Sequence, residues 1–227
     1  ESGFDVKLTA GTHGGCMRLL GLTDGPQTLE ALKGKTIGVT DMAGADKNFF
    51  ALLLKRHGLD PNTDVEWRAY PQDLLPIVLK KGEIQAASGS DPVMYRLTQE
   101  AGYREIATNL SDVYAHLSCC VVGTRGSLIR DQPDVAAAIT HAILQAHAYA
   151  AKHPDTIGTQ FNSKALNTSP AEIAAVLRTH THGHYSVGNE FVKEIDVYAR
   201  DLQAINVLRP ETNALQFARG ITANVLV

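Results

Sequence analysis

Several features that would assign this 227-residue sequence to a familiar class are missing from it. No run of about 18 apolar residues occurs, so no transmembrane helix is predicted. Lys and Arg total 21 against 24 Asp and Glu, and they form no basic stripe. The sequence therefore gives no reason to expect nucleic acid or an anionic membrane surface as a partner.

The common catalytic and nucleotide-binding motifs are missing as well. The sequence has no G-x-S-x-G elbow, no Walker A motif and no G-x-G-x-x-G after Val39. Cys16 and His13 lie three residues apart, but no acid that would orient the histidine is evident. We therefore predict no catalytic residues and no cofactor.

Cysteine is scarce, with only Cys16, Cys119 and Cys120 in the chain. An odd number excludes a fully paired disulfide framework within one chain. Two arrangements remain open: one disulfide with one free thiol, or three partly buried thiols. The second arrangement is the commoner one.

The most informative stretch that is present runs from Leu32 to Phe50. Thr36 to Thr40 is a short apolar run with β-branched residues, which is typical of a buried strand. Asp41 to Ala45 is a small-residue loop, and a helical pattern runs from Asp46 to Gly58. A loop between a strand and a helix start can hold an anion or a polar ligand on free backbone N–H groups. An ordinary turn would have the same sequence pattern.

Strand and helix patterns alternate through the first half of the chain, and the second half is nearly all helical. This alternation predicts an α/β protein with a mostly parallel sheet. The predicted strands are 5–12, 36–40, 65–70, 83–88, 105–108 and 117–123, and the predicted helices are 46–57, 73–81, 93–102, 131–153, 170–179, 189–205 and 213–226. Before the helix at 170, Ser169 and Glu172 have the spacing of a capping box.

Polar, small-residue loops follow three of these strands. The carboxyl ends of parallel strands open into one crevice, where such loops can bind a small polar or anionic ligand. The candidate ligand-binding residues are Thr12, His13, Gly14, Thr40, Asp41, Met42, Gly44, Ala45, Ser90 and Asp91.

Three histidines alternate in the sequence THTHGHY, at His180, His182 and His184. Alternate side chains of an extended segment point the same way, so these imidazoles are candidate zinc ligands. No acid or cysteine lies near them in the sequence, and an exposed polar loop between helices is the preferred interpretation. We therefore predict no metal site.

The order of several segments resembles a known family. LKGKTIGV, GLDPNTDVEWRAYP, LKKGEIQAASGSDP and LSCCVVGTRGSLIRDQPDVAAAITHAILQA follow one another as in solute-binding proteins of ABC importers. The most similar group binds nitrate, sulfonates, taurine or thiamine precursors. The resemblance extends over essentially the whole chain.

The resemblance implies a type II periplasmic-binding-protein fold, in which two lobes close on a ligand by a hinge. Residues 16–116 would form lobe two, while 1–15 and 117–227 would form lobe one with the C-terminal helices. It places the candidate residues above in the crevice between the lobes. It also brings Cys16 near Cys119 and Cys120, so a disulfide between them is a hypothesis that fits an oxidising periplasm.

The chain departs from the family pattern at two places. Family members begin with about 80 to 90 further residues that build lobe one, so we expect this lobe to be incomplete. Because an incomplete lobe would expose apolar helix faces, self-association or a stabilising partner is predicted. Ser90 stands where family members often have an aromatic residue, which leaves the class of solute open.

The resemblance favours a non-catalytic solute-binding component that delivers a small polar or anionic solute to an ABC permease. Its expected location is the periplasm, or the extracytoplasmic face of a membrane as an anchored protein. The chain begins with Glu1 and shows no signal peptide, which is expected of a processed or truncated N-terminus. An enzyme on the same fold, similar to pyrimidine synthases or desulfinases and using His13 and Cys16, is the main alternative. A sensor or regulatory module is a third.

Overall fold

The computed structural model describes residues 3–161, 168–183 and 185–226, and these form two compact units. Unit 2 is the continuous segment Gly15–Ala115, whereas unit 1 combines Glu1–Gly14 with His116–Val227. That the two units act as hinged lobes remains a prediction. None of the helices in the described ranges has the length and apolar character needed to cross a membrane.

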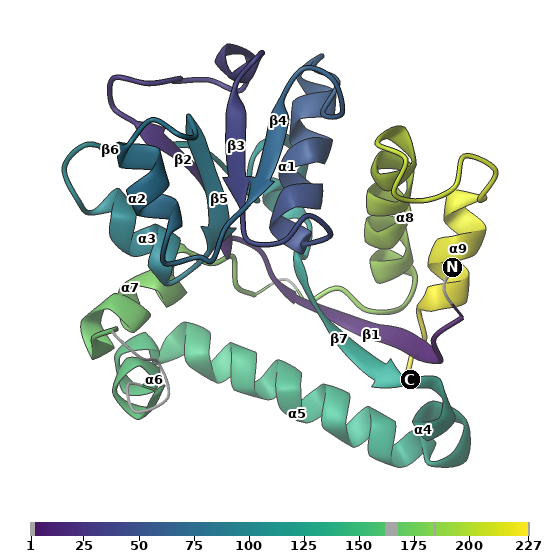
Figure 1. Ribbon diagram of the computed structural model, residues 1–227. Coiled ribbons are helices and arrows are strands. Elements are labelled where there is room, and N and C mark those ends of the chain that lie inside the picture. Colours follow the sequence, from purple (N-terminus) through teal and green to yellow (C-terminus); the bar gives the residue numbers. More distant parts are fainter. Residues whose placement is uncertain (1–2, 162–167, 184, 227) are drawn as a thin grey trace. The chain divides into compact units, whose positions relative to one another are not determined.

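Unit 2 is a five-stranded sheet covered by helices on both faces (Figure 1). The strand order is β4-β3-β5-β2-β6, in which β3 runs parallel to β4 and β5 while β2 is antiparallel to β5 and β6. The strands are β2 (Met17–Leu22), β3 (Thr36–Val39), β4 (Glu66–Ala69), β5 (Ala86–Ser90) and β6 (Tyr103–Thr108), and the helices are η1 (Glu30–Leu32), α1 (Ala45–Arg56), α2 (Leu75–Lys80), α3 (Val93–Thr98) and η2 (Asp112–His116). Four of the five strands run in the same direction, as predicted, but β2 was not predicted, and it makes two of the four strand pairs antiparallel.

The helices of unit 2 are placed by the order of its strands. The chain moves from β3 to β4 in one direction and from β4 to β5 in the other, so right-handed crossovers put α1 and α2 on opposite faces. Leu75 and Leu79 of α2 pack with Leu20 of β2 and Ala87 of β5 in the core on one face. On α1, Phe49 contacts the ring of Tyr114 with centroids 4.9 Å apart.

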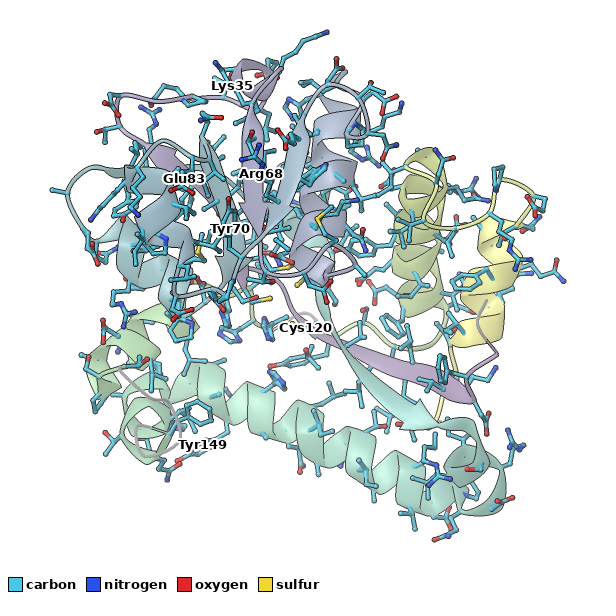
Figure 2. All side chains as sticks on the ribbon, in the orientation of Figure 1. Lys35, Arg68, Tyr70, Glu83, Cys120 and Tyr149 are labelled. Atoms are coloured by element: carbon cyan, nitrogen blue, oxygen red, sulfur yellow. The ribbon has the colours of Figure 1, made fainter. Side chains whose placement is uncertain are left out.

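The outer strand β4 has an exposed, charged surface. Figure 2 labels Arg68 on β4 and Tyr70 just beyond it, and Arg68 Nε lies 2.8 Å from Glu66 Oε1. Charged side chains on an edge strand oppose pairing with strands of other molecules.

Unit 1 is mostly helical, with one antiparallel pair of strands. β1 (Val6–His13) pairs with β7 (Cys120–Arg125), and His13 is opposite Cys120, which Figure 2 labels. The prediction that the first strand belongs to the parallel sheet was therefore wrong. The helices are α4 (Gly126–Asp131), α5 (Pro133–Lys152), α6 (Pro154–Phe161), α7 (Pro170–Thr179), α8 (Gly188–Ala204) and α9 (Ala214–Ile221), of which α4 and α6 were not predicted.

The core of unit 1 lies along the strand pair. Ala10, Val122 and Leu144 are buried together, and Thr9 Oγ1 lies 2.9 Å from Thr140 Oγ1 of α5. The predicted capping box is present at α7, because Ser169 Oγ accepts from Glu172 N at 3.2 Å and Ser169 N donates to Glu172 Oε2 at 2.7 Å. The core contacts hold α5 against the strand pair, and the capping box fixes where α7 begins.

Candidate functional site

The loop after β3 is held by one buried carboxylate. Asp46, at the start of α1, is 4% exposed, and its Oδ2 accepts from Thr40 Oγ1 at 3.1 Å and from Ser88 Oγ of β5 at 3.2 Å. Thr40 N also donates to this oxygen, at 3.3 Å. The structure therefore brings the ends of β3 and β5 together, as expected for parallel strands. It also puts a negative charge beside the helix start that the sequence indicated as an anion site.

The rest of this loop is an exposed turn. Asp41 Oδ1 accepts from Ala43 N at 2.8 Å, and Asp41 O accepts from Gly44 N at 3.0 Å. A Cβ on Gly44 would lie 2.6 Å from Asp46 Oδ1, so only glycine fits this position without movement. Met42 is 49% exposed and Ala45 is also exposed. Thr40 to Ala43 and Ala45 therefore face solvent, and a ligand can reach them.

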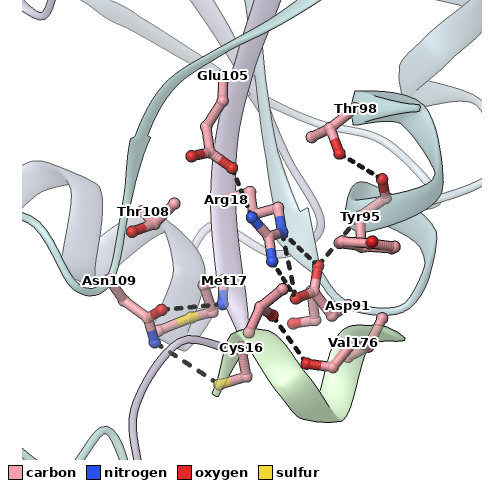
Figure 3. A network of polar contacts seen from close by, with 12 residues as sticks. Cys16, Met17, Arg18, Asp91, Tyr95, Thr98, Glu105, Thr108, Asn109 and Val176 are labelled. Atoms are coloured by element: carbon pink, nitrogen blue, oxygen red, sulfur yellow. Dashed lines mark hydrogen bonds and ion pairs between the residues drawn. The ribbon is translucent and has the colours of Figure 1, made fainter. Parts of the chain in front are cut away.

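Asp91 belongs to a buried ion-pair network (Figure 3). Arg18 Nε lies 2.9 Å from Asp91 Oδ1, and Arg18 Nη1 lies 2.5 Å from Glu105 Oε2. Asp91 Oδ1 also accepts from Tyr95 N at 3.0 Å, at the start of α3. Burial lowers the pKa of Arg18, but its bonds to Asp91 and Glu105 outweigh this and raise it overall. The contacts of Asp91 in unit 2 are those of a structural residue.

Ser90 lies at the exposed end of β5. Its carbonyl oxygen accepts from Gln72 Nε2 at 2.8 Å. The hydroxyl of this residue is the only polar group of its side chain, so Ser90 offers a ligand one hydrogen-bonding group and no apolar wall.

The first predicted segment lies in unit 1, where two of its residues serve the fold. Thr12 is 3% exposed and its hydroxyl donates to Cys120 O at 3.0 Å. Gly14 N donates to Thr181 Oγ1 at 2.8 Å, and Gly14 O accepts from Thr181 N at 3.1 Å. Only His13 of the three predicted residues directs a side chain into a cavity.

That cavity, of about 290 Å³, is lined by four imidazoles. His13 comes from the end of β1, His147 from α5, and His180 and His182 from the segment after α7. The remaining lining residues are Ala146, Ala150, Ile157 and Leu177. The histidine-rich segment was predicted to be exposed, but His180 and His182 are half-buried, while His184 lies outside the described residues. The prediction that alternate histidines share one side is confirmed for His180 and His182.

The imidazoles interact with one another. The His13 and His180 rings are stacked, with centroids 4.4 Å apart and planes at 4°, and the His13 and His147 centroids are 5.4 Å apart. Burial lowers the pKa of His147, and the nearby His13 and His182 lower it further. His147 is therefore neutral at neutral pH. Nothing in the sequence singled it out, since it is one of three histidines within a long helical segment.

The cysteines lie in the described part of the chain, and each carries a thiol. Cys119 Sγ and Cys120 Sγ are 3.9 Å apart, and Cys16 Sγ accepts from Asn109 Nδ2 at 3.6 Å. The hypothesis of a disulfide from Cys16 to Cys119 or Cys120 was therefore wrong for this structure.

Comparison with known proteins connects this architecture to solute-binding proteins. The chain matches the sequence model of the NMT1-like family over residues 20–159. No curated protein sequence matches it. The aliphatic sulphonate binding protein SsuA from Escherichia coli is 14% identical, with a TM-score of 0.77 over 96% of this chain and 74% of that one.

Two further solved structures have the same fold. The nitrate-binding protein NrtA from Synechocystis PCC 6803 is 10% identical, with a TM-score of 0.75 over 97% of this chain and 66% of that one. The ligand-binding component of an ABC-type import system from Staphylococcus aureus, with zinc bound, is 13% identical, with a TM-score of 0.73 over 99% and 74% of the two chains. The chain thus spans two thirds to three quarters of these proteins and has the mixed α/β fold of periplasmic binding proteins. It belongs to the NMT1-like family.

Proposed function

We propose that this chain is the solute-binding component of an ABC importer and that it binds a small polar or anionic solute. One observation carries the proposal: the chain has, nearly end to end, the fold of periplasmic proteins that bind sulfonates or nitrate. The solute would be of the nitrate, sulfonate, taurine or bicarbonate type. Its partner would be an ABC permease, and its location extracytoplasmic.

Within unit 2, the exposed loop Thr40 to Ala45 is the proposed contact surface. Thr40 donates its hydroxyl proton to Asp46, which leaves the lone pairs of Thr40 Oγ1 for a ligand donor. The first backbone N–H groups of α1 have no partner within the helix and point toward this loop. Both kinds of group suit a polar solute that carries donors as well as a negative charge, as taurine does.

We propose further that the chain has no catalytic activity. The acceptor opposite His13 Nδ1 is the carbonyl oxygen of Gly14, at 3.3 Å, and a carbonyl does not orient a general base as a carboxylate does. The enzyme alternative, with His13 and Cys16, predicts a new product when the protein is incubated with a sulfinate, the substrate class of a desulfinase. Mass spectrometry that detects such a product would reject the transport role.

The test of solute binding is calorimetric titration of the whole natural protein with nitrate, bicarbonate, taurine and an alkanesulfonate. We expect one of them to bind, and Thr40→Val to weaken it about tenfold, which corresponds to ~1.4 kcal/mol. Thr36→Val is the matched control, because Thr36 lies at the opposite end of β3 and bonds to Glu66 Oε2 at 3.2 Å. Equal effects of the two variants, or no binding of any compound, would contradict the proposal.

A further inference from the structure

The helix α5 carries an apolar stripe on the side that faces away from the strand pair of unit 1. Its buried residues, Ala136, Thr140 and Leu144, recur every four residues and form the side that packs on β1 and β7. A surface helix normally presents polar side chains on its other side. Six exposed residues there are instead apolar, and we call them the outer stripe: Val135, Ala138, Ile139, Ala142, Ala146 and Tyr149. A continuous exposed apolar face of this kind marks a surface that binds another protein.

The outer stripe is symmetric in sequence about Ala142. Val135 and Tyr149 lie seven residues to either side of it, and they are 42% and 47% exposed. Ala138 and Ala146 lie four residues to either side, and Figure 2 labels Tyr149 near one end of the stripe. Because alanines occupy the middle, a second helix can approach the axis of α5 to about 8 Å. The stripe therefore fits an identical stripe that runs in the opposite direction.

We propose that the outer stripe binds the outer stripe of a second copy of this chain, with the two α5 helices antiparallel. Val135 of one copy then lies opposite Tyr149 of the other, and Ala142 lies at the centre of the contact. Both copies use the same surface around a two-fold axis, which is the commonest arrangement in protein dimers. Such a contact closes on two copies and covers both stripes.

Charges at the two ends of α5 determine the orientation. Asp134 and Lys152 are 18 residues apart, which is five helical turns, so they lie in line beside the stripe. Both are exposed, and neither takes part in an ion pair within residues 3–161, 168–183 and 185–226. Reversal about Ala142 brings Lys152 of one copy to about 3 Å, measured along the helix, from the position opposite Asp134 of the other copy. Two attractive contacts result, whereas a parallel pair would put like charges together, so the charges select the antiparallel orientation.

The size of the stripe sets the expected affinity. The helix α5 has 20 residues and is therefore about 30 Å long, and the contact that one helix offers is about 10 Å wide. This footprint is smaller than the roughly 800 Å² that each partner buries in an interface of standard size. We therefore expect a weak dimer, with a dissociation constant of about 10–100 μM.

The test is sedimentation equilibrium of the full 227-residue chain, at concentrations up to about ten times the expected dissociation constant. We expect a monomer–dimer equilibrium, and Ile139→Glu should raise the dissociation constant at least about tenfold, because it places a charge in an apolar contact. Val207→Glu is the matched control, because Val207 lies after α8 in the same unit and is 43% exposed, as against 41% for Ile139. Both side chains are exposed, so neither change should unfold the chain. No solute is present, so either outcome leaves the solute-binding proposal untouched.

Exchange of the end charges tests the orientation. Asp134→Lys replaces two attractive contacts of the dimer with two repulsive ones and should weaken the dimer about tenfold. Adding Lys152→Asp restores both contacts and the net charge of the chain, so the double variant should dimerise as the wild type does. In a parallel pair the double variant would remain weak, because like charges would still meet. A wild-type chain that stays monomeric, equal effects of Ile139→Glu and Val207→Glu, or a double variant as weak as Asp134→Lys would each overturn the proposal.

Discussion

Removing the charge of Asp91 should destabilise unit 2 strongly. The side chains of Arg18 and Asp91 are 9% and 2% exposed, and Asp91→Asn would leave the guanidinium with Glu105, whose side chain is 38% exposed. Removing one partner of a buried ion pair lowers the free energy of unfolding by about 3–5 kcal/mol. Because Glu105 remains beside Arg18, we expect a loss of about 3 kcal/mol for Asp91→Asn. Asn keeps an oxygen for the Tyr95 N–H, so the change isolates the charge. For a unit of about 100 residues, the melting temperature should fall by roughly 12–24 °C.

Urea unfolding followed by circular dichroism measures this effect, with Glu66→Gln as the control. Glu66 forms an exposed ion pair with Arg68 in the same unit, and such pairs contribute at most about 1 kcal/mol. Adding Arg18→Met to Asp91→Asn should recover part of the loss, because it removes a buried charge that has lost its buried carboxylate partner. If Asp91→Asn unfolds at the same urea concentration as Glu66→Gln, the pair does not stabilise the fold as reasoned here. A loss of solute binding in folded Asp91→Asn would instead support a direct contact with the solute.

Two further predictions concern stability. Hydrogen bonds to Glu30 and, less strongly, to Asp112 raise the pKa of His57 above 6.5. The stability that these bonds give should therefore be full below pH 6.5 and be lost as the pH rises through the higher pKa of the folded state. Urea midpoints measured across this range should depend less on pH in His57→Gln, and an unchanged pH dependence in that variant would refute the prediction. Gly158→Ala should lower the free energy of unfolding by about 1–3 kcal/mol, because its Cβ would lie 2.3 Å from a backbone carbonyl oxygen of α7. Gly220→Ala is the control, since a Cβ there would have nothing within 4 Å, and it should be neutral or slightly stabilising. Equal melting temperatures of the two variants would contradict the close approach of α6 and α7.

Local sequence signals predicted the elements whose determinants are themselves local. Ser169 and Glu172 predicted the start of α7 because a capping box is complete within four residues. The strand, loop and helix start around Thr40 were predicted for the same reason. In contrast, β2 was missed because five of its six residues are buried between two antiparallel neighbours and show no alternation. The prediction ended a helix at residue 153 and placed none directly after it, but proline suits the first position of a new helix, and α6 begins at Pro154.

The candidate site was less predictable because its contacts connect residues that are distant in the sequence. Asp46 was assigned only to a helix start, yet its carboxylate binds Ser88, which belongs to another strand. His147 became a candidate only when α5 brought it beside His13. For His180 and His182 the alternation was informative, but their burial depends on the helices that surround them.

The division of the chain into a continuous unit and a split one has a consequence for biosynthesis. Unit 2 is complete once Ala115 has been made, whereas β1 pairs with β7, which follows the whole of unit 2. At a translation rate of about 5–20 residues per second, β1 emerges from the ribosome seconds before its partner strand exists. Unit 2 can therefore fold while the nascent chain is still attached. Throughout that interval β1 lacks the strand with which it pairs in unit 1.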